Sequence, residues 1–389
     1  MRNLPGVLRL RDGVVTGIAA ARPGALELQV SVAGLGAVAA LCYPDLVGAP
    51  APGGAVVLNT AALELGLGTG GIALVVHVVQ AATEPPGMPP EMPPGMAQAP
   101  GARLVKARYT PHQVCVAGAD DHGSPHQGAI EQAARSGLGG MPVVTADLHS
   151  ALPAIVAGVH AARPAARVAY LMTDGGALPL AASRTVAGLG DRLCGTVTTG
   201  QAFGGSVETV TVHSGLLACR AVLGADVVVV APGPGTAGTG TTWGFAGVAA
   251  GEALNAARIL GGRPVGCLRV SGSDPRPRHR GISHHCLTAY GRVALVAAQI
   301  VVPTGLPDGL DGIVAAAAAP LATVHELVTV QTHPLHDELL RVHAALPGGL
   351  STMGRDYEQD PAPFLAAGAA GWHAAKLLGV SAPGPSPSR

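Results

Sequence analysis

The chain contains few charged residues. Charged side chains make up 12% of its 389 residues, about half of the usual share of roughly 25%. The 24 basic and 24 acidic residues cancel, whereas a protein that binds nucleic acid through phosphate contacts needs a basic surplus. The composition therefore excludes nucleic acid as a bulk electrostatic partner, and the balance shows no strongly acidic or basic tail.

Aromatic residues and lysine are also scarce. There are three Phe, two Trp and five Tyr, and only Lys106 and Lys376 among the basic residues are lysine. Ala, Val and Leu must therefore fill the interior. Glycine and proline are abundant, at 56 and 33 residues, but the hydrophobic share of 48% favours a folded chain over a disordered one. A length of 389 residues predicts about two domains.

Long apolar runs are absent. The runs at 293–302 and 313–324 are short or interrupted by a polar residue or proline, whereas a membrane-spanning helix needs about 18–20 apolar residues. Arg9, Arg11 and Asp12 lie where a signal peptide would have its apolar segment. The six cysteines include no CxxC pair, so neither a zinc motif nor a redox motif is predicted. We therefore expect a cytoplasmic protein with reduced thiols and no membrane partner.

A tract rich in proline, glycine and methionine at residues 84–101 divides the chain. Such a tract sustains neither a helix nor a central strand, and it predicts a linker or an exposed loop. Before it, short β-type runs alternate with turn residues about every eight to twelve positions, which predicts a small all-β domain at 1–83, a barrel or sandwich. The expected strands are 13–16, 25–32, 36–42, 55–58 and 72–79.

After the tract, apolar runs alternate with Ala-rich segments of helical length, which predicts an α/β domain at 102–389. Continuous apolar runs are typical of strands buried on both faces, so we expect a mainly parallel sheet with helices on both faces. A Rossmann-like three-layer fold and a closed (β/α)₈ barrel are both compatible with this pattern. The expected strands are 114–119, 142–146, 168–172, 196–199, 227–231, 265–270, 293–302 and 324–330.

Both folds place ligands at the carboxyl ends of their strands. Polar and Gly-rich segments follow most of the expected strands, and the richest is 271–285. Loops tolerate polar residues in any protein, but this concentration stands out in a chain with 12% charge. It predicts a binding site at this edge of the sheet.

The Gly-rich loop at 233–242 partly matches two phosphate-binding motifs. Its glycines have the spacing of the dinucleotide fingerprint, but no acidic residue lies about 20 positions further on. It also outlines a phosphate loop with threonine in place of lysine, so no cofactor is assigned. Backbone N–H groups in such a turn can bind an anion, although close packing is an equal alternative. The candidate residues are Gly233, Gly235, Gly238, Thr239, Gly240 and Thr241.

The segment 274–285 supplies positive charge. Arg276, Arg278 and Arg280 surround His279 and follow Asp274, and guanidinium groups in this pattern can clamp a phosphate or carboxylate. A solvated basic loop is the alternative.

Ser283 is expected to cap a short helix that begins with His284 and His285. The helix dipole would lower the pKa of both imidazoles there. Because adjacent helical residues diverge by about 100°, we expect at most one of the two to point into the site, where its neutral imidazole would transfer protons or bind a metal.

His149 and Asp174 follow successive expected strands. If those strands are adjacent, the two side chains form a histidine oriented by a carboxylate, the minimal general base. The alternative is a metal site with His149, Asp147, Asp174 and His284 as ligands, although no recognised spacing supports it.

At these motifs the chain resembles an uncharacterised bacterial family, the domain-of-unknown-function family 3866. The family carries no assigned activity, so the resemblance implies one continuous bacterial cytoplasmic protein and no residue roles. The similarity covers nearly the whole chain, through residues 57–71, 108–113, 149–150, 172–179, 233–247, 274–291, 351–355 and 358–372.

Together these features favour an enzyme that performs acid–base chemistry, by transfer or hydrolysis, on a small anionic and phosphate-bearing metabolite. A sensor for a nucleotide-like ligand is one alternative. An assembly protein is another, because the Ala-rich faces would allow a homo-oligomer.

Overall fold

The computed structural model describes residues 8–64, 66, 71–79 and 102–379. The chain forms two compact units, one comprising residues up to 100 together with 109–114, and the other comprising 101–108 together with 115 onward. The expected linker at 84–101 lies outside the described residues. No helix within the described ranges is both long and apolar enough to span a bilayer.

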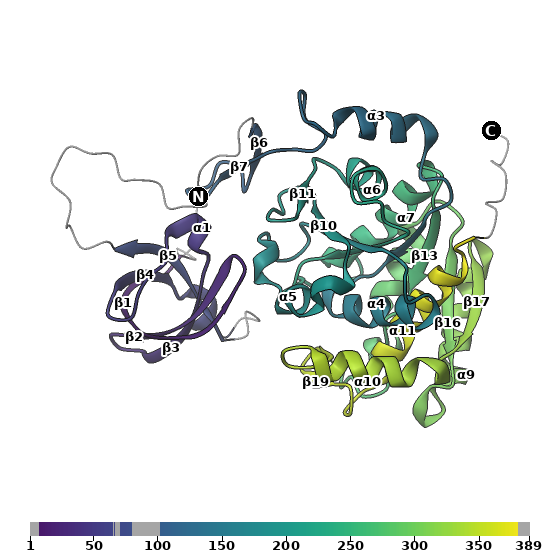
Figure 1. The fold of residues 1–389 in the computed structure, drawn as a ribbon. Helices are drawn as coiled ribbons and strands as arrows, with labels where there is room; N and C mark the ends of the chain where they lie inside the picture. The colour runs from purple at the N-terminus through teal and green to yellow at the C-terminus, as the bar shows by residue number, and fades with distance from the viewer. Residues whose placement is uncertain (1–7, 65, 67–70, 80–101, 380–389) are drawn as a thin grey trace, which may run out of the picture. The chain divides into compact units, whose positions relative to one another are not determined.

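The first unit contains a closed five-stranded barrel with the strand order β1-β2-β3-β5-β4, which confirms the expected β-barrel-like domain (Figure 1). Strand β1 is long and contains two register shifts, and it closes the barrel by pairing with both β2 and β4. Alternate side chains such as Leu28, Val30 and Leu58 fill the interior. The elements are β1 (Leu10–Arg22), β2 (Ala25–Val32), β3 (Gly36–Cys42), α1 (Pro44–Val47), β4 (Ala55–Asn59), α2 (Ala61–Glu64) and β5 (Ala73–Val79).

The second unit contains an eight-stranded sheet in which every pair of neighbours is parallel. The order is β11-β10-β9-β12-β8-β13-β16-β17. Because β11 and β17 are edge strands of an open sheet, the alternative of a closed (β/α)₈ barrel is wrong. The strands are β8 (Pro142–Thr145), β9 (Val168–Thr173), β10 (Gly195–Thr198), β11 (Val207–Glu208), β12 (Val227–Pro232), β13 (Arg263–Cys267), β16 (Gln299–Thr304) and β17 (Glu326–Gln331).

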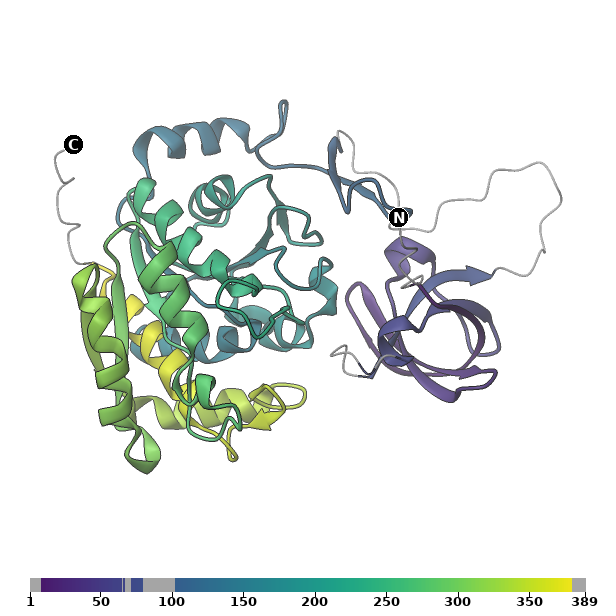
Figure 2. The same ribbon diagram turned by 180° about the vertical axis from the view of Figure 1, so that it is seen from behind.

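Helices cover both faces of this sheet, as expected for an α/β fold (Figure 2). Successive residues of a strand point to opposite faces, so Val144 packs with α4 and α11 while Val143 packs with α6 and α7. The first face carries α4 (Leu152–Ala162), α10 (His336–Ala345) and α11 (Ala362–Lys376), and the second carries α3 (Gln127–Ser136), α6 (Val212–Ala221) and α7 (Ala249–Ile259). The remaining α-helices are α5 (Arg184–Leu189), α8 (His284–Thr288) and α9 (Leu310–Ala318).

Two expected strands differ from the structure. The segment expected as a strand at 114–119 is divided, because β7 (Val114–Val116) pairs with β6 (Leu104–Lys106) while Gly118 forms a single parallel bridge with Glu208 of β11. One edge strand of the large sheet is β11, which the sequence does not predict because its two residues are too few to form a recognisable apolar run. The strand expected at 293–302 begins only at Gln299, because residues 289–293 form a π-helical turn.

The strand order creates a crevice in the middle of the sheet. Strand β8 lies between β12 and β13. The chain leaves β8 through α4 on one face and leaves β12 through α7 on the other face. At such a switch point the loops beyond the carboxyl ends diverge, and open α/β sheets bind their ligands there.

Candidate functional site

A cavity of about 120 Å³ lies beyond the carboxyl ends of β8, β12 and β13. It brings together the polar segments that follow these three strands, as the sequence predicts for the loops at 233–242 and 271–285. The lining residues are Asp147, Leu148, Thr236, Ala237, Gly238, Thr239, Phe245, Gly247, Arg269, Arg276, Arg278, His279, His285 and Met353.

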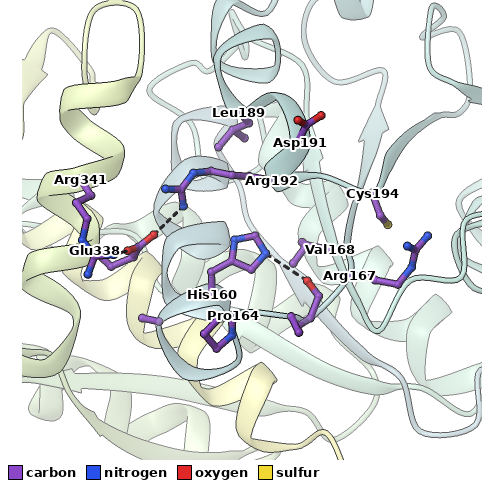
Figure 3. Close-up of a pocket in the computed structure, with 13 residues that line it drawn as sticks. His160, Pro164, Arg167, Val168, Leu189, Asp191, Arg192, Cys194, Glu338 and Arg341 are labelled. Atoms are coloured by element: carbon purple, nitrogen blue, oxygen red, sulfur yellow. Dashed lines mark hydrogen bonds and ion pairs between the residues drawn. The ribbon is translucent and has the colours of Figure 1, made fainter.

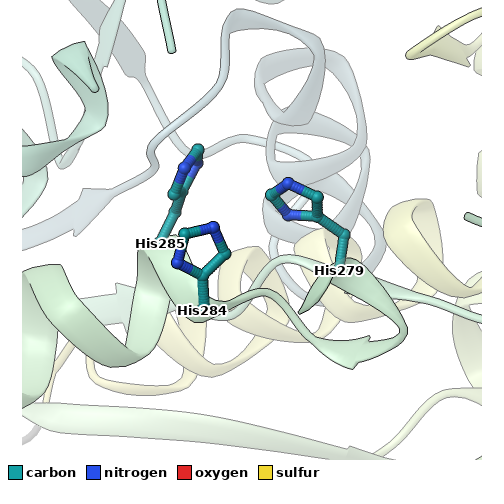
Figure 4. Close-up of side chains that lie close together, drawn as sticks. All are labelled: His279, His284 and His285. Atoms are coloured by element: carbon teal, nitrogen blue, oxygen red, sulfur yellow. The ribbon is translucent and has the colours of Figure 1, made fainter. Parts of the chain in front are cut away.

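Three histidines lie close together beside this cavity, and two of them, His279 and His285, line it. His279 ends a short 3₁₀ turn, and His284 and His285 begin α8. Each offers a ring nitrogen, and these atoms lie within 4.8 Å of one another. Figure 4 shows the three rings turned toward a common point. Of the two adjacent histidines, His285 lines the cavity and His284 does not, which agrees with the expectation that at most one of the pair points into the site.

Ser283 holds this arrangement. As the N-cap of α8, its Oγ accepts a hydrogen bond from the backbone N–H of His285 over 3.3 Å, which confirms the predicted cap. The same Oγ shares a hydrogen bond of 2.8 Å with Nδ1 of His279. Ser283 is fully buried. Ser283 therefore links the side chain of His279 to the first turn of α8.

The ring of His285 is held between neighbours. Phe245 stacks on it with a centroid separation of 3.9 Å and an interplanar angle of 2°. A Cβ added at Gly238 would lie 3.5 Å from Cε1 of His285, so the glycine lets the Gly-rich loop approach the ring. Nε2 of His285 and Nε2 of His284 are buried and have no hydrogen-bond partner.

All three imidazoles are neutral near pH 7. Burial is the main cause, and it lowers the pKa of His279 to about 4 and that of His285 to about 3. The pKa of His284 is lowered by burial and then by the charge of Arg278. The sequence alone predicts that the helix dipole lowers the pKa values of His284 and His285. In the structure, the removal of water by burial is the larger cause.

The three arginines of the predicted clamp have different roles. Asp274 accepts two hydrogen bonds of 2.9 Å from Nε and NH2 of Arg276, and one of 3.1 Å from Arg355. Arg276 holds the pKa of the Asp274 carboxyl well below its usual range. The guanidinium of Arg276 is therefore already paired. Arg280 is exposed and does not line the cavity; its Nε donates to the carbonyl of Gly272 over 3.4 Å.

Arg278 is the member of the segment that is available to a ligand. It lines the cavity and is exposed. Within the described part of the chain it makes no ion pair, whereas Arg276 and Arg355 are both paired with acids. Arg269, at the end of β13, adds a second positive charge to the wall of the cavity.

Asp147 is the one acidic residue among those that line the cavity. The sequence predicts it only as a possible metal ligand. It is buried, its Oδ2 makes no hydrogen bond, and the nearest cation is NH1 of Arg269 at 3.8 Å. Burial raises the pKa of the Asp147 carboxyl, and Arg269 opposes the shift. A Cβ at Gly247 would lie 2.8 Å from Cβ of Asp147. The glycine thus lets the chain before α7 pass close to this carboxyl.

Internal hydrogen bonds and close packing occupy part of the Gly-rich loop at 233–242. The hydroxyls of Thr239 and Thr241 share a hydrogen bond of 2.9 Å, and Thr241 also accepts from the N–H of Gly244. A Cβ at Gly233 would lie 2.5 Å from the carbonyl oxygen of Ala177, so this glycine serves packing. Of the six candidates in the loop, only Gly238 and Thr239 line the cavity, while Gly233, Gly235, Gly240 and Thr241 do not.

The predicted pair of His149 and Asp174 is not formed. Strand β12 lies between β8 and β9, so the two residues do not follow neighbouring strands. The ring of His149 bonds to Ser183 Oγ over 2.7 Å and to the Tyr170 hydroxyl over 3.1 Å. Asp174 accepts a hydrogen bond from the N–H of Gln201 over 2.8 Å. Neither residue lines the cavity.

His149 is expected to make stability depend on pH. Burial lowers its pKa to about 4, below the unfolded value of about 6.5. The unfolded state therefore binds more protons between these values, and the contribution of His149, present above pH 6.5, is lost as the pH falls through 4. Urea unfolding of the wild type should show this loss between pH 7 and pH 4.5. In His149→Gln it should be smaller by about 2 kcal/mol.

His333→Gln is the matched control for this measurement, because His333 is exposed. It should keep the pH dependence of the wild type. The same pH dependence in His149→Gln and His333→Gln would show that His149 does not titrate on unfolding.

A second cavity lies near the amino ends of the strands, whereas the first lies beyond their carboxyl ends. It measures about 880 Å³ and is lined by residues near the amino ends of β9 and β10, among them Arg167 and Arg192 (Figure 3). Its two lining arginines nearest the sheet are paired within the protein: NH1 of Arg192 donates to Glu338 over 2.7 Å, and Arg167 donates to the carbonyls of Leu223 and Gly224. The smaller cavity, with its unpartnered polar atoms, is therefore the stronger candidate.

Comparison with known proteins agrees with the resemblance noted from the sequence. The model of the family described as "Protein of unknown function (DUF3866)" matches residues 39–371. No curated protein matches the chain.

Proposed function

Because the chain belongs to the DUF3866 family, whose function is unknown, we propose an activity from the geometry of its own site. The chain is an enzyme that performs acid–base chemistry, by transfer or hydrolysis, on a small anionic metabolite that carries a phosphate group. The observation that carries the proposal is the cavity at the switch point of the sheet, which joins uncompensated positive charge to a buried carboxyl.

The anion is held by the wall that contains Arg278 and Arg269. Arg278 is unpaired with any acid in the described structure. Arg269 lies at 3.8 Å from Asp147, beyond hydrogen-bond distance. A guanidinium presents parallel N–H groups that match two oxygens of a phosphate or carboxylate. The backbone of residues 236–239 faces the same space and adds polar groups.

The proton is exchanged by Asp147. A carboxyl whose pKa is raised by burial holds a proton closer to neutral pH than an exposed one, and it can release that proton within the cavity. Its Oδ2 has no internal partner, so a substrate atom can occupy that position. In hydrolysis, the ionised form of Asp147 accepts a proton from the attacking water as its oxygen bonds to phosphorus, and the carboxyl then gives that proton to the leaving oxygen as the bond from phosphorus to that oxygen breaks.

We also propose a Rossmann-like fold for the second unit and a cytoplasmic location for the protein. Helices on both faces and a central switch point support a Rossmann-like three-layer arrangement. All six cysteines are free thiols, which supports a reducing compartment such as the bacterial cytoplasm.

Arg278→Ala should weaken the binding of inorganic phosphate by about tenfold or more, because a charge-assisted hydrogen bond contributes about 1.5–3 kcal/mol. Isothermal titration calorimetry on the full chain measures this directly. Arg280→Ala is the matched control, since Arg280 lies two residues further on, is exposed and does not line the cavity. Its phosphate affinity should equal that of the wild type.

Turnover is tested with phosphate monoesters on the wild type and on Asp147→Asn. We expect the variant to retain phosphate binding and to lose hydrolysis or transfer. Binding at 100 times Kd should also stabilise the wild type by about 2.7 kcal/mol. If no phosphate or carboxylate compound binds, the proposal fails; if one binds without turnover, the chain is a sensor.

A further inference from the structure

We propose that His279, His284 and His285 bind one zinc ion, with a fourth coordination position open to the cavity. The three residues lie on the segment that joins β14 (Val270–Ser271) and β15 (Gly281–Ile282) and on the first turn of α8. Three imidazoles with one open position form a recognised class of zinc site. The inference goes beyond the proposed function, because it stands whether or not a phosphate binds beside it.

The geometry suits one small ion. A tetrahedral zinc with Zn–N bonds of about 2.0–2.1 Å holds its ligand nitrogens about 3.3 Å apart. The three ring nitrogens already lie within 4.8 Å of one another. Small rotations of the side chains close the remaining distance. The rings are tilted or perpendicular to one another, at 49°, 52° and 80°, so no two of them stack and shield their nitrogens.

The buried ring nitrogens here lack partners, unlike those of other buried histidines in the same unit. Both nitrogens of His149 are hydrogen-bonded. His325 accepts from the N–H of Ala298 and bonds to the carbonyl of Tyr290. Nε2 of His284 and Nε2 of His285 have no such partner, and His285 is nine-tenths buried. An unpartnered buried polar atom costs about 1–3 kcal/mol, and a bound cation satisfies both nitrogens at once.

His279 has the outer contact that is usual for a metal-binding histidine. A histidine that binds a metal usually donates its other ring N–H to an oxygen, which orients the ring. Nδ1 of His279 lies 2.8 Å from Ser283 Oγ, and the stacking of Phe245 fixes the plane of His285. These neighbours hold the rings in place before an ion arrives.

The charged side chains around the three histidines favour an anion as the fourth ligand of the zinc ion. Arg269, Arg276 and Arg278 oppose a bare dication, whereas Asp147 and Asp274 favour it. An anion at the open position offsets the excess of positive charge, and the cavity beside His279 and His285 has room for one. When bound, zinc supplies a Lewis acid at this position.

The test is a calorimetric titration of ZnCl₂ into the full-length chain after treatment with a chelator, in buffer free of phosphate. We expect one ion per chain. His284→Ala removes the least buried ligand, so it is the variant best able to fold, and it should weaken zinc binding by at least about 100-fold. Ser283→Ala keeps all three imidazoles and should weaken binding by about 10–100-fold. His126→Ala, at an exposed position, should leave the affinity unchanged.

Cobalt(II) substitution provides a readout that does not depend on affinity alone. Co²⁺ in the wild type should give the intense visible absorption of a tetrahedral ion, and His284→Ala should lose it while its circular dichroism stays that of a folded protein. Zinc binding that is equal in wild type and His284→Ala, or that disappears in His126→Ala, overturns the site. Phosphate binding measured without zinc tests the proposed function separately, so either proposal can fail alone.

Discussion

Gly158→Ala is expected to destabilise the α/β unit by about 3 kcal/mol. Gly158 lies on α4 where this helix crosses α11. A Cβ added there would overlap the carbonyl oxygen of Gly368 and would lie 2.9 Å from the backbone nitrogen of Trp372. The opposing atoms are backbone rather than a flexible side chain, so the helices must separate, and the layer that supports β8 and β13 loses packing.

Thermal or urea unfolding measures this effect, with Gly312→Ala as the control. Gly312 is an exposed position within α9, and no atom lies within 4 Å of an added Cβ. Alanine there should stabilise the protein by about 0.5–1 kcal/mol, because glycine is the poorer helix former. A Gly158→Ala protein within about 1 kcal/mol of the wild type would mean that α4 and α11 do not approach as closely as described.

Asp274→Ala is expected to lower the free energy of unfolding by about 3 kcal/mol. The carboxyl is buried and accepts from Arg276 and Arg355. Its loss would leave both guanidinium groups without their main acceptor. Arg355 belongs to the hairpin of β18 (Ser351–Thr352) and β19 (Arg355–Asp356), so Asp274 joins two segments that are far apart in sequence. The segment that carries His279 and Arg278 should lose its fixed position, and phosphate affinity should fall as well.

The Asp274 carboxyl should also make the free energy of unfolding depend on pH in the acidic range. Arg276 holds the pKa of Asp274 below its unfolded value of about 3.9. Its contribution is therefore fully present above that value, and it is lost as the pH falls through the lower folded pKa. Asp337→Ala is the control, because Asp337 is exposed, and it should change stability by less than about 1 kcal/mol. Equal losses in Asp274→Ala and Asp337→Ala would refute the role of Asp274.

Much of the fold is predictable because it follows local patterns. The strands expected at 25–32 and 36–42 have these bounds in the structure. The apolar run at 227–231 becomes β12, which is buried along its whole length. The pattern misses β11, since two residues carry no periodicity and the strand is defined by its pairing with β10 and its bridge to Gly118.

The site was predictable in part. The segment with Arg278, His279 and His285 was identified from its unusual charge, and Ser283 from its place before a helix. The partnership of His149 with Asp174 failed because it assumed that strands consecutive in sequence are neighbours in the sheet. The sequence indicates Asp147 as a possible metal ligand, but its burial beside Arg269 has no sequence signal.

The sequence by itself determined a small all-β domain followed by an α/β unit, and it predicted that polar loops collect at the carboxyl ends of the parallel strands. Hydrophobic periodicity and turn residues act over a few positions, so they can be read along the chain. Only the tertiary structure decided that β8 lies between β12 and β13, that Asp274 holds Arg355, and that three histidines share one point. Each of these contacts depends on packing between distant segments, and no local pattern records which segments will meet.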